Sequence, residues 1–183
     1  MKIFVITLAR TLKWIYAYEA INLLFRVLPS RYIVLILSYF GANIGKGIRI
    51  QTPFTIHNAD QKSPIFSNLS IGDDCYVGRD CIFDLMGKIT IGKKVTISHR
   101  AVLNTHTNAG NSPNTSGPLI ISSGDIEIND GAYLGSNTTI LENVKIGQDA
   151  IIGSKSLVNK NIPDRVTAFG IPCKVNKQNK NDN

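Results

Sequence analysis

The sequence predicts an all-β solenoid, a parallel β-helix with a short α-helical N-terminal segment and one loop insertion. The first observation behind this prediction is that an aliphatic residue recurs at every sixth position between 128 and 163. Helices repeat at about 3.6 residues and strands at about 2, whereas a six-residue repeat is typical of a parallel β-helix. The aliphatic residues are Ile128, Leu134, Ile140, Ile146, Ile152 and Val158.

Two further observations concern the corners that such a repeat requires. The fifth place of each hexad is mostly small, as expected for a side chain crowded into a corner. These residues are Ala132, Thr138, Val144, Ala150, Ser156 and Ile162. The place after the aliphatic residue often holds Gly or Asn, which tolerate backbone angles that other residues avoid. This place is occupied by Asn129, Gly135, Gly147, Gly153 and Asn159.

The same repeat extends towards the N-terminus. Three hexads would close one triangular coil of about 18 residues, so about five coils fit between residues 44 and 163. An irregular β-sandwich would not keep six consecutive hexads in phase. The earlier aliphatic positions are Ile44, Ile50, Ile56, Ile65, Ile71, Val77, Phe83, Ile91, Ile97 and Leu103.

The chain divides into three parts, and its net charge of +7 is placed unevenly among them. Residues 1–43 form an apolar, basic segment with five basic residues and one acidic residue. Residues 44–163 form the β-helix, which contains the active-site loop 104–125, and residues 164–183 form a closing segment with a basic tail. Basic residues therefore gather at the two ends and form no face of the solenoid, so nucleic acid is not expected as a partner.

The cysteines and the first forty residues indicate the cellular compartment in which the protein is expected. Cys75 and Cys81 fall at corner places, and the odd total of three cysteines argues against a disulfide framework, so we expect a cytoplasmic protein. Residues 1–40 contain no uncharged stretch of the roughly 20 residues needed to span a bilayer, and no cleavable signal. We expect one amphipathic helix to about Leu28 and a second helix with Ser30 as its N-cap.

Two interpretations of these N-terminal helices stay open. They could cap the open end of the solenoid or pack against other subunits, because an uncapped β-helix exposes strand edges. Their basic and apolar residues would also suit peripheral contact with an anionic membrane, at its inner face.

The hexads stop between Leu103 and Ile126, and His106 lies at the start of this insertion. Solenoids often place insertions on the binding face. A neutral imidazole there can accept a proton from a hydroxyl group near pH 7, which makes His106 a candidate general base.

Three segments give the chain a specific resemblance. The first runs from Ile89 to Ser98 and leads to Thr105-His106, the second is Ile152-Gly153-Ser154-Lys155-Ser156-Leu157-Val158, and the third joins Asn161-Ile162-Pro163 to Gly170-Ile171-Pro172-Cys173-Lys174-Val175. Residues 44–175 thereby resemble the hexapeptide-repeat acyltransferases, in the branch of the maltose, galactoside and capsule-sugar O-acetyltransferases. The resemblance implies a left-handed coil, against the usual right-handed crossover.

The resemblance also implies site residues. His106 would be the general base for direct attack of a sugar hydroxyl on the acetyl-CoA thioester, and Asp84 and Asn104 would bind the acceptor. Acetyl-CoA would lie in a groove between subunits of a homotrimer. Its candidate contacts are Gly135, Ser136, Gly153, Ser154, Lys160 and Lys174. The family's Trp-Ile-Gly motif reads Tyr133-Leu134-Gly135 here, so the aromatic wall of that groove differs.

Other functions remain open at this point. An N-acetyltransferase of a nucleotide-linked amino sugar would share the fold, as would a non-catalytic scaffold. A γ-carbonic-anhydrase-like enzyme would need three histidines for zinc. The chain has only His57, His99 and His106, and their hexad places point them at unlike angles. We expect no metal, and we expect a sugar or glycan acceptor in surface or exported polysaccharide biosynthesis.

Overall fold

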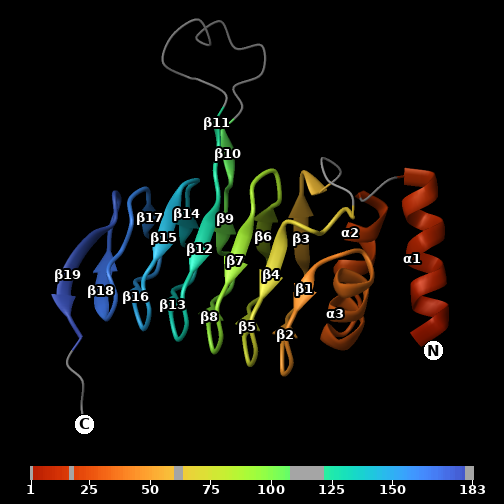
Figure 1. Ribbon diagram of the computed structural model, residues 1–183, viewed down its shortest axis with the longest axis horizontal. Helices are drawn as coiled ribbons and strands as arrows, with labels where there is room; N and C mark the ends of the chain where they lie inside the picture. The colour runs from red at the N-terminus through yellow and green to blue at the C-terminus, as the bar shows by residue number, and fades with distance from the viewer. Residues whose placement is uncertain (1, 17–18, 60–63, 108–121, 180–183) are drawn as a thin grey trace, which may run out of the picture.

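The computed structural model describes residues 2–16, 19–59, 64–107 and 122–179, without the side chains of residues 12–19. Short strands wind into three sheets that form the sides of a solenoid, and helices lie at its N-terminal end (Figure 1). A β-ladder rises from one edge of the solenoid (Figure 1). The predicted solenoid with N-terminal helices and one insertion is therefore present.

Each sheet takes one strand from each coil. Sheet A contains the parallel strands β1 (Asn43–Ile44), β4 (Leu69–Ile71), β7 (Ile89–Ile91), β12 (Ile126–Ile128) and β15 (Val144–Ile146). Sheet C contains β3 (Phe54–His57), β6 (Cys81–Asp84), β9 (Val102–Leu103), β14 (Thr139–Ile140) and β17 (Leu157–Val158).

Sheet B is longer and closes the C-terminal end. Its parallel strands are β2 (Arg49–Ile50), β5 (Tyr76–Val77), β8 (Thr96–Ile97), β13 (Tyr133–Leu134), β16 (Ile151–Ile152) and β18 (Val166–Phe169). The last strand, β19 (Lys174–Gln178), pairs antiparallel with β18 and is exposed along its length. The strands β10 (His106–Thr107) and β11 (Ser122–Ser123) form a separate antiparallel pair.

The six-residue repeat corresponds to three buried columns. In sheet C, for example, Phe83 pairs with Leu103, which pairs with Ile140, which pairs with Val158. All four are completely buried, so apolar burial along the axis holds the coils together. The exception is Ile65, which is buried but lies in the turn before β4 and belongs to no column.

The corners confirm the expected small residues but change the reason for the glycines. A Cβ added to Gly135 would lie 2.5 Å from the backbone nitrogen of Ser154 in the next coil. Glycine is therefore needed here for close approach between coils. The left-handed backbone occurs two residues later, as at Asn137 with a φ of 59°. Cys81 fills a corner, and burial raises the pKa of its thiol to about 11.

The N-terminal helices complete the open strand edges of the first coil. Asn22 donates from Nδ2 to the Ile56 carbonyl (2.8 Å) and accepts from the Ile56 N–H (3.0 Å), which replaces a neighbouring strand at β3. The Ser30 hydroxyl accepts from the Ile50 N–H at 2.8 Å, at the edge of β2. These contacts confirm that the helices cap the solenoid.

The boundaries of these helices differ from those expected. Two helices, α1 (Lys2–Tyr16) and α2 (Glu19–Phe25), lie where one was predicted. The third, α3 (Ser30–Tyr39), has Pro29 as its N-cap, because the Ser30 hydroxyl is used by β2. None of the described helices is both long and apolar enough to cross a bilayer.

Candidate active site

The candidate site lies on the edge between sheets C and A, where the repeat is interrupted. The chain leaves sheet C at the end of β9, runs through β10 and returns through β11 to sheet A at β12. Residues 108–121 lie outside the described part of the chain, so the site is built from the two ends of loop 104–125. His106 is the first residue of β10 and pairs with Ser123 of β11; Figure 1 labels the two strands.

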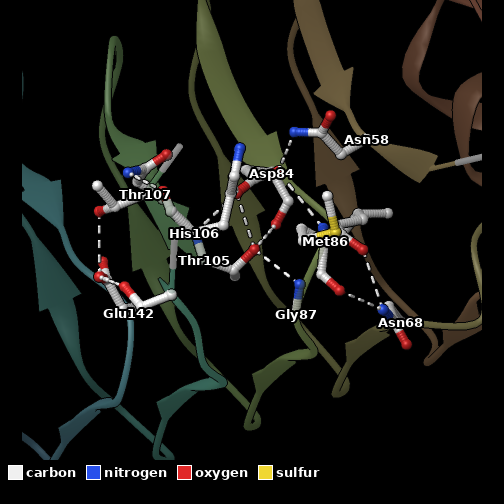
Figure 2. Close-up of polar contacts among 12 residues, drawn as sticks. Asn58, Asn68, Asp84, Met86, Gly87, Thr105, His106, Thr107 and Glu142 are labelled. Carbon is white, nitrogen blue, oxygen red and sulfur yellow. Dashed lines mark hydrogen bonds and ion pairs between the residues drawn. The ribbon is translucent and has the colours of Figure 1, made fainter. Parts of the chain in front are cut away.

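Asp84 and His106 form the central contact of the site. Asp84 ends β6 in the coil below, and its Oδ2 lies 2.6 Å from Nδ1 of His106 (Figure 2). The Asp84 side chain is 4% exposed and that of His106 is 21% exposed. Both residues are predicted from the sequence, and the structure brings them together.

Several donors surround the Asp84 carboxylate. Its Oδ1 accepts from Asn58 Nδ2 at 2.7 Å, and its Oδ2 accepts from the Thr105 N–H (2.9 Å) and hydroxyl (2.8 Å). Burial alone would raise the pKa of Asp84. The hydrogen bonds from Asn58, His106 and Thr105 together outweigh burial and lower that pKa, so the carboxylate is ionised at neutral pH.

Thr105 joins Asp84 to a third segment of the chain, and sequence reasoning did not single out its role. It is completely buried, and its Oγ1 accepts from the Gly87 N–H at 2.9 Å while donating to Asp84. Asn58 was missed as well. The sequence did mark their common partner Asp84 as unusual, because it follows Phe83 at the hexad place that Gly or Asn usually occupies.

Asn104 and Glu142 hold the backbone that carries His106. Asn104 donates from Nδ2 to the His106 carbonyl at 2.9 Å, so contact between Asn104 and an acceptor stays a prediction. Glu142 was not predicted. Its Oε1 accepts from Thr107 Oγ1 (3.1 Å) in β10 and from Ser122 Oγ (2.9 Å) in β11 (Figure 2 shows the first contact). Its Oε2 is buried and has no hydrogen-bond partner among the described residues.

The serine and glycine residues expected to bind acetyl-CoA lie on another edge. Gly135, Ser136, Gly153 and Ser154 connect sheet B to sheet C. The Gly135 N–H donates to the Ile152 carbonyl and the Gly153 N–H to the Ala168 carbonyl, so both of these backbone donors are used between coils of the solenoid.

Polar side chains are nonetheless present on this edge. The Ser136 hydroxyl lies 3.2 Å from Nδ1 of His99, and Ser154 is exposed. Contact of these residues with a cofactor stays a prediction.

The two lysines are also separated from each other. Lys160 follows β17 and is exposed on the edge between sheets C and A, the edge that carries His106. Lys174 opens β19 and lines a surface groove with Phe169, Pro172 and Val175. The proposed cofactor residues therefore do not form one groove within a single chain.

The three histidines do not come together. His57 ends β3, His99 contacts Ser136 on the edge between sheets B and C, and His106 contacts Asp84. Across the described ranges, no three or more His, Cys, Asp or Glu side chains are grouped so that they could hold a metal ion.

Comparison with known proteins relates this solenoid to a family of bacterial enzymes. Residues 125–160 match the family described as bacterial transferase hexapeptide (six repeats). The chain is 30% identical, over 145 residues, to a protein of Escherichia coli named as a colanic acid biosynthesis acetyltransferase, WcaF; the match covers 79% of this chain and 74% of that protein. A shorter match, 43% identical over 53 residues, is to a galactoside O-acetyltransferase of Lactococcus lactis and covers 29% of this chain and 26% of that protein.

Solved structures share the fold over almost the whole chain. A hexapeptide-repeat acetyltransferase from Vibrio cholerae, complexed with acetyl-CoA, has a TM-score of 0.75 at 19% identity and covers 97% of this chain and 88% of its own. A galactoside acetyltransferase complexed with coenzyme A has a TM-score of 0.73 at 22% identity and covers 98% and 82%. The left-handed parallel β-helix is thereby confirmed. The coverage and identity of these relatives show that the chain belongs to the hexapeptide-repeat transferases of bacteria, as an acyltransferase.

Proposed function

We propose that this protein transfers an acetyl group from acetyl-CoA to a hydroxyl group of a sugar, with His106 as the general base. The observation that carries the proposal is the 2.6 Å contact between His106 Nδ1 and the buried Asp84 carboxylate. Because Asp84 is ionised, it accepts from Nδ1–H, which fixes the imidazole tautomer and leaves the lone pair of the base on Nε2. No hydrogen bond to Nε2 occurs among the residues that the structure describes.

The arrangement supports a direct transfer. The sugar hydroxyl would give its proton to Nε2 of His106 as its oxygen attacks the thioester carbonyl, and the imidazolium would then protonate the departing CoA thiolate. Asp84 would stabilise the imidazolium that forms between these steps. A covalent cysteine intermediate has no support, because burial raises the pKa of Cys75, Cys81 and Cys173.

A second protomer would complete the site. Within one chain, His106 lies on the edge between sheets C and A, while Ser136 and Ser154 lie on the edge between sheets B and C. A CoA held at the second edge therefore reaches His106 only if this edge belongs to a neighbouring molecule. Each protomer offers one edge of each kind, so head-to-tail contacts between unlike edges would close a ring, and we propose the trimer that the family resemblance implies, with three equivalent sites between subunits.

The relatives support the class of acceptor. Those compared above include enzymes named for the acetylation of galactosides and for colanic acid biosynthesis. We infer from them that the acceptor is a sugar or glycan and that the product belongs to a surface or exported polysaccharide.

The test is an acetyl-CoA thiol-release assay with purified protein against a panel of monosaccharides, nucleotide-linked amino sugars and lipid-linked glycans. Sugar-dependent release with an ester product that mild base cleaves is the expected result. A base-stable amide, formed only with amino sugars, would show that the acceptor is an amine. Thiol release that no panel member stimulates would contradict a sugar transferase.

A further inference from the structure

The first helix exposes several large apolar side chains that are not covered by the rest of the protein. Val5 and Ala9 of α1 are buried against the rest of the protein. Away from this buried side, Ile3 is 84% exposed and Phe4 69%, and Leu8, on the flank of the helix, is 37% exposed. A helix packed on one side normally carries polar residues on the other, and a helix that is apolar on both sides is normally covered on both.

The second helix, which packs against the first, also exposes apolar side chains. Ala20, Ile21 and Phe25 of α2 are buried, whereas Leu23 is 61% exposed and Val27, just after the helix, is 74% exposed. The helices α1 and α2 pack against each other at the N-terminal end of the solenoid (Figure 1). We call this surface the N-terminal apolar face; it consists of Ile3, Phe4, Leu8, Leu23 and Val27.

Exposed basic side chains lie on the same N-terminal segment. Lys2, Arg10, Arg26 and Arg31 are all exposed, and none forms an ion pair within the described ranges. Lys2 and Arg31 lie at a groove between α1 and α3 whose apolar lining includes Ile3, Val34 and Leu35.

The positive charge of this segment distinguishes between two candidate partners for the N-terminal apolar face, a second copy of the chain and an anionic bilayer. A second copy of the chain would bring the same positive charges to the contact, which opposes association. An anionic bilayer offers hydrocarbon for the apolar side chains and phosphate for the basic ones.

We propose that the N-terminal apolar face docks the protein on an anionic phospholipid bilayer, with α1 lying in the plane of the headgroups. Asn22 and Ser30, which cap the strand edges, point into the protein and would keep these contacts on docking.

The position of the face leaves the active site accessible. The β10–β11 ladder rises from the middle of the solenoid, whereas α1 is the outermost element at one end (Figure 1). In the cyclic trimer proposed above, symmetry places three such faces at the same height along the axis. Three weak contacts on one membrane would then act together and strengthen binding.

The experiment is vesicle flotation of the full-length protein. Vesicles of phosphatidylcholine alone are compared with vesicles that also contain phosphatidylglycerol, at low and high ionic strength. We expect binding to the anionic vesicles only, weakened by salt, since exposed charges are screened within about 10 Å at moderate ionic strength. Wild-type protein that ignores anionic vesicles, or binds neutral ones equally well, would overturn the proposal.

Two variants test the two components. Replacing Ile3, Phe4 and Leu8 together by Ser should abolish flotation, and Arg10→Gln with Arg26→Gln should lower the partition coefficient by roughly 30-fold. The matched control, Lys94→Gln with Lys177→Gln, removes two exposed charges from the solenoid and should bind as wild type. Unchanged flotation of the Ser variant would contradict the proposal. The proposal would also be contradicted if the wild type did not bind vesicles and the Ser variant had a lower oligomer mass than the wild type. That pair of results would instead identify a second copy of the chain as the partner of this face.

Discussion

The two edges of sheet C are built from the same repeat but differ in what they contain. On the edge between sheets B and C the hexads run without interruption, and the corners hold small buried residues such as Ala101, Thr138 and Ser156. On the edge between sheets C and A the repeat is broken after β9, and Asp84, Thr105 and His106 form a connected polar network there.

This difference shows how the fold divides its tasks. Unbroken coils bury aliphatic columns, and most of their backbone N–H groups donate hydrogen bonds to the neighbouring coil. Few polar groups are then left to act on a substrate. Where the repeat is interrupted, side chains do not have to fill a hexad position, and the coil below supplies a buried carboxylate that orients them. We expect substitutions in the polar network on the interrupted edge to lower kcat, and substitutions of buried corner residues on the regular edge, away from Ser136 and Ser154, to affect stability at most.

The largest effect is expected at the base itself. His106→Ala should lower kcat by roughly 10²–10⁴-fold, the range for loss of a positioned general base. The fold should survive, because the imidazole is partly exposed and lies outside the buried columns. His99→Ala is the comparison: because His99 contacts Ser136 on the edge proposed to hold CoA, this variant should change the KM for acetyl-CoA at most and keep kcat near that of the wild type. Steady-state thiol release measures both, and near-wild-type turnover of His106→Ala would refute the mechanism.

The next effect is expected at the residue that orients the base. Asp84→Asn should lower kcat by about 10²-fold, the lower end of that range, because the charge that stabilises the imidazolium is lost. A purely acceptor-binding Asp84 would instead raise KM and leave kcat nearly unchanged. Measuring the two constants separately therefore distinguishes orientation of His106 from contact with the sugar.

Thr105 on the interrupted edge and Thr138 on the regular edge are both completely buried, so matched substitutions there compare how the two edges contribute to the free energy of unfolding. Thr105→Val leaves the Gly87 N–H without its acceptor and should destabilise the protein by roughly 1–3 kcal/mol. Thr138, on the regular edge, has no partner for its Oγ1 among the described residues, so Thr138→Val should be neutral or stabilising. Urea unfolding at one fixed protein concentration gives both values. Equal losses in the two variants would mean that the network contributes nothing beyond side-chain burial.

The repeat made most of the fold predictable, because each buried column repeats a local rule at a fixed spacing. Columns such as Phe83, Leu103 and Ile140 follow from this rule alone. The site was predictable only in part. His106 stood out because it begins the interruption, whereas Asn58 and Thr105 matter through contacts with Asp84 from different coils, which no spacing in the sequence reveals. The predicted N-cap of α3 was wrong for a similar reason, since the Ser30 hydroxyl contacts β2 instead of capping its helix.

The smallest effect is expected at Glu142, and it tests how the interruption is held in place. Glu142 accepts hydroxyl hydrogen bonds from both strands of the β10–β11 ladder, so Glu142→Ala should loosen the backbone that carries His106. We expect kcat to fall by roughly tenfold or less, since even a 1 Å misplacement of a catalytic group costs up to about 10²-fold.

A conservative change at the same position separates positioning from charge. Glu142→Gln keeps one carbonyl oxygen for Thr107 and Ser122 and should restore most of the activity. Glu127→Ala is the matched control, because among the described residues that carboxylate forms an exposed ion pair with Lys145 and no contact to the β10–β11 ladder, and it should leave kcat unchanged. If Glu142→Gln is as impaired as Glu142→Ala, the charge of the buried carboxylate matters more than its hydrogen bonds. In that case the important atom would be Oε2, which has no hydrogen-bond partner among the described residues. It would contact a group of the acceptor or of the neighbouring subunit.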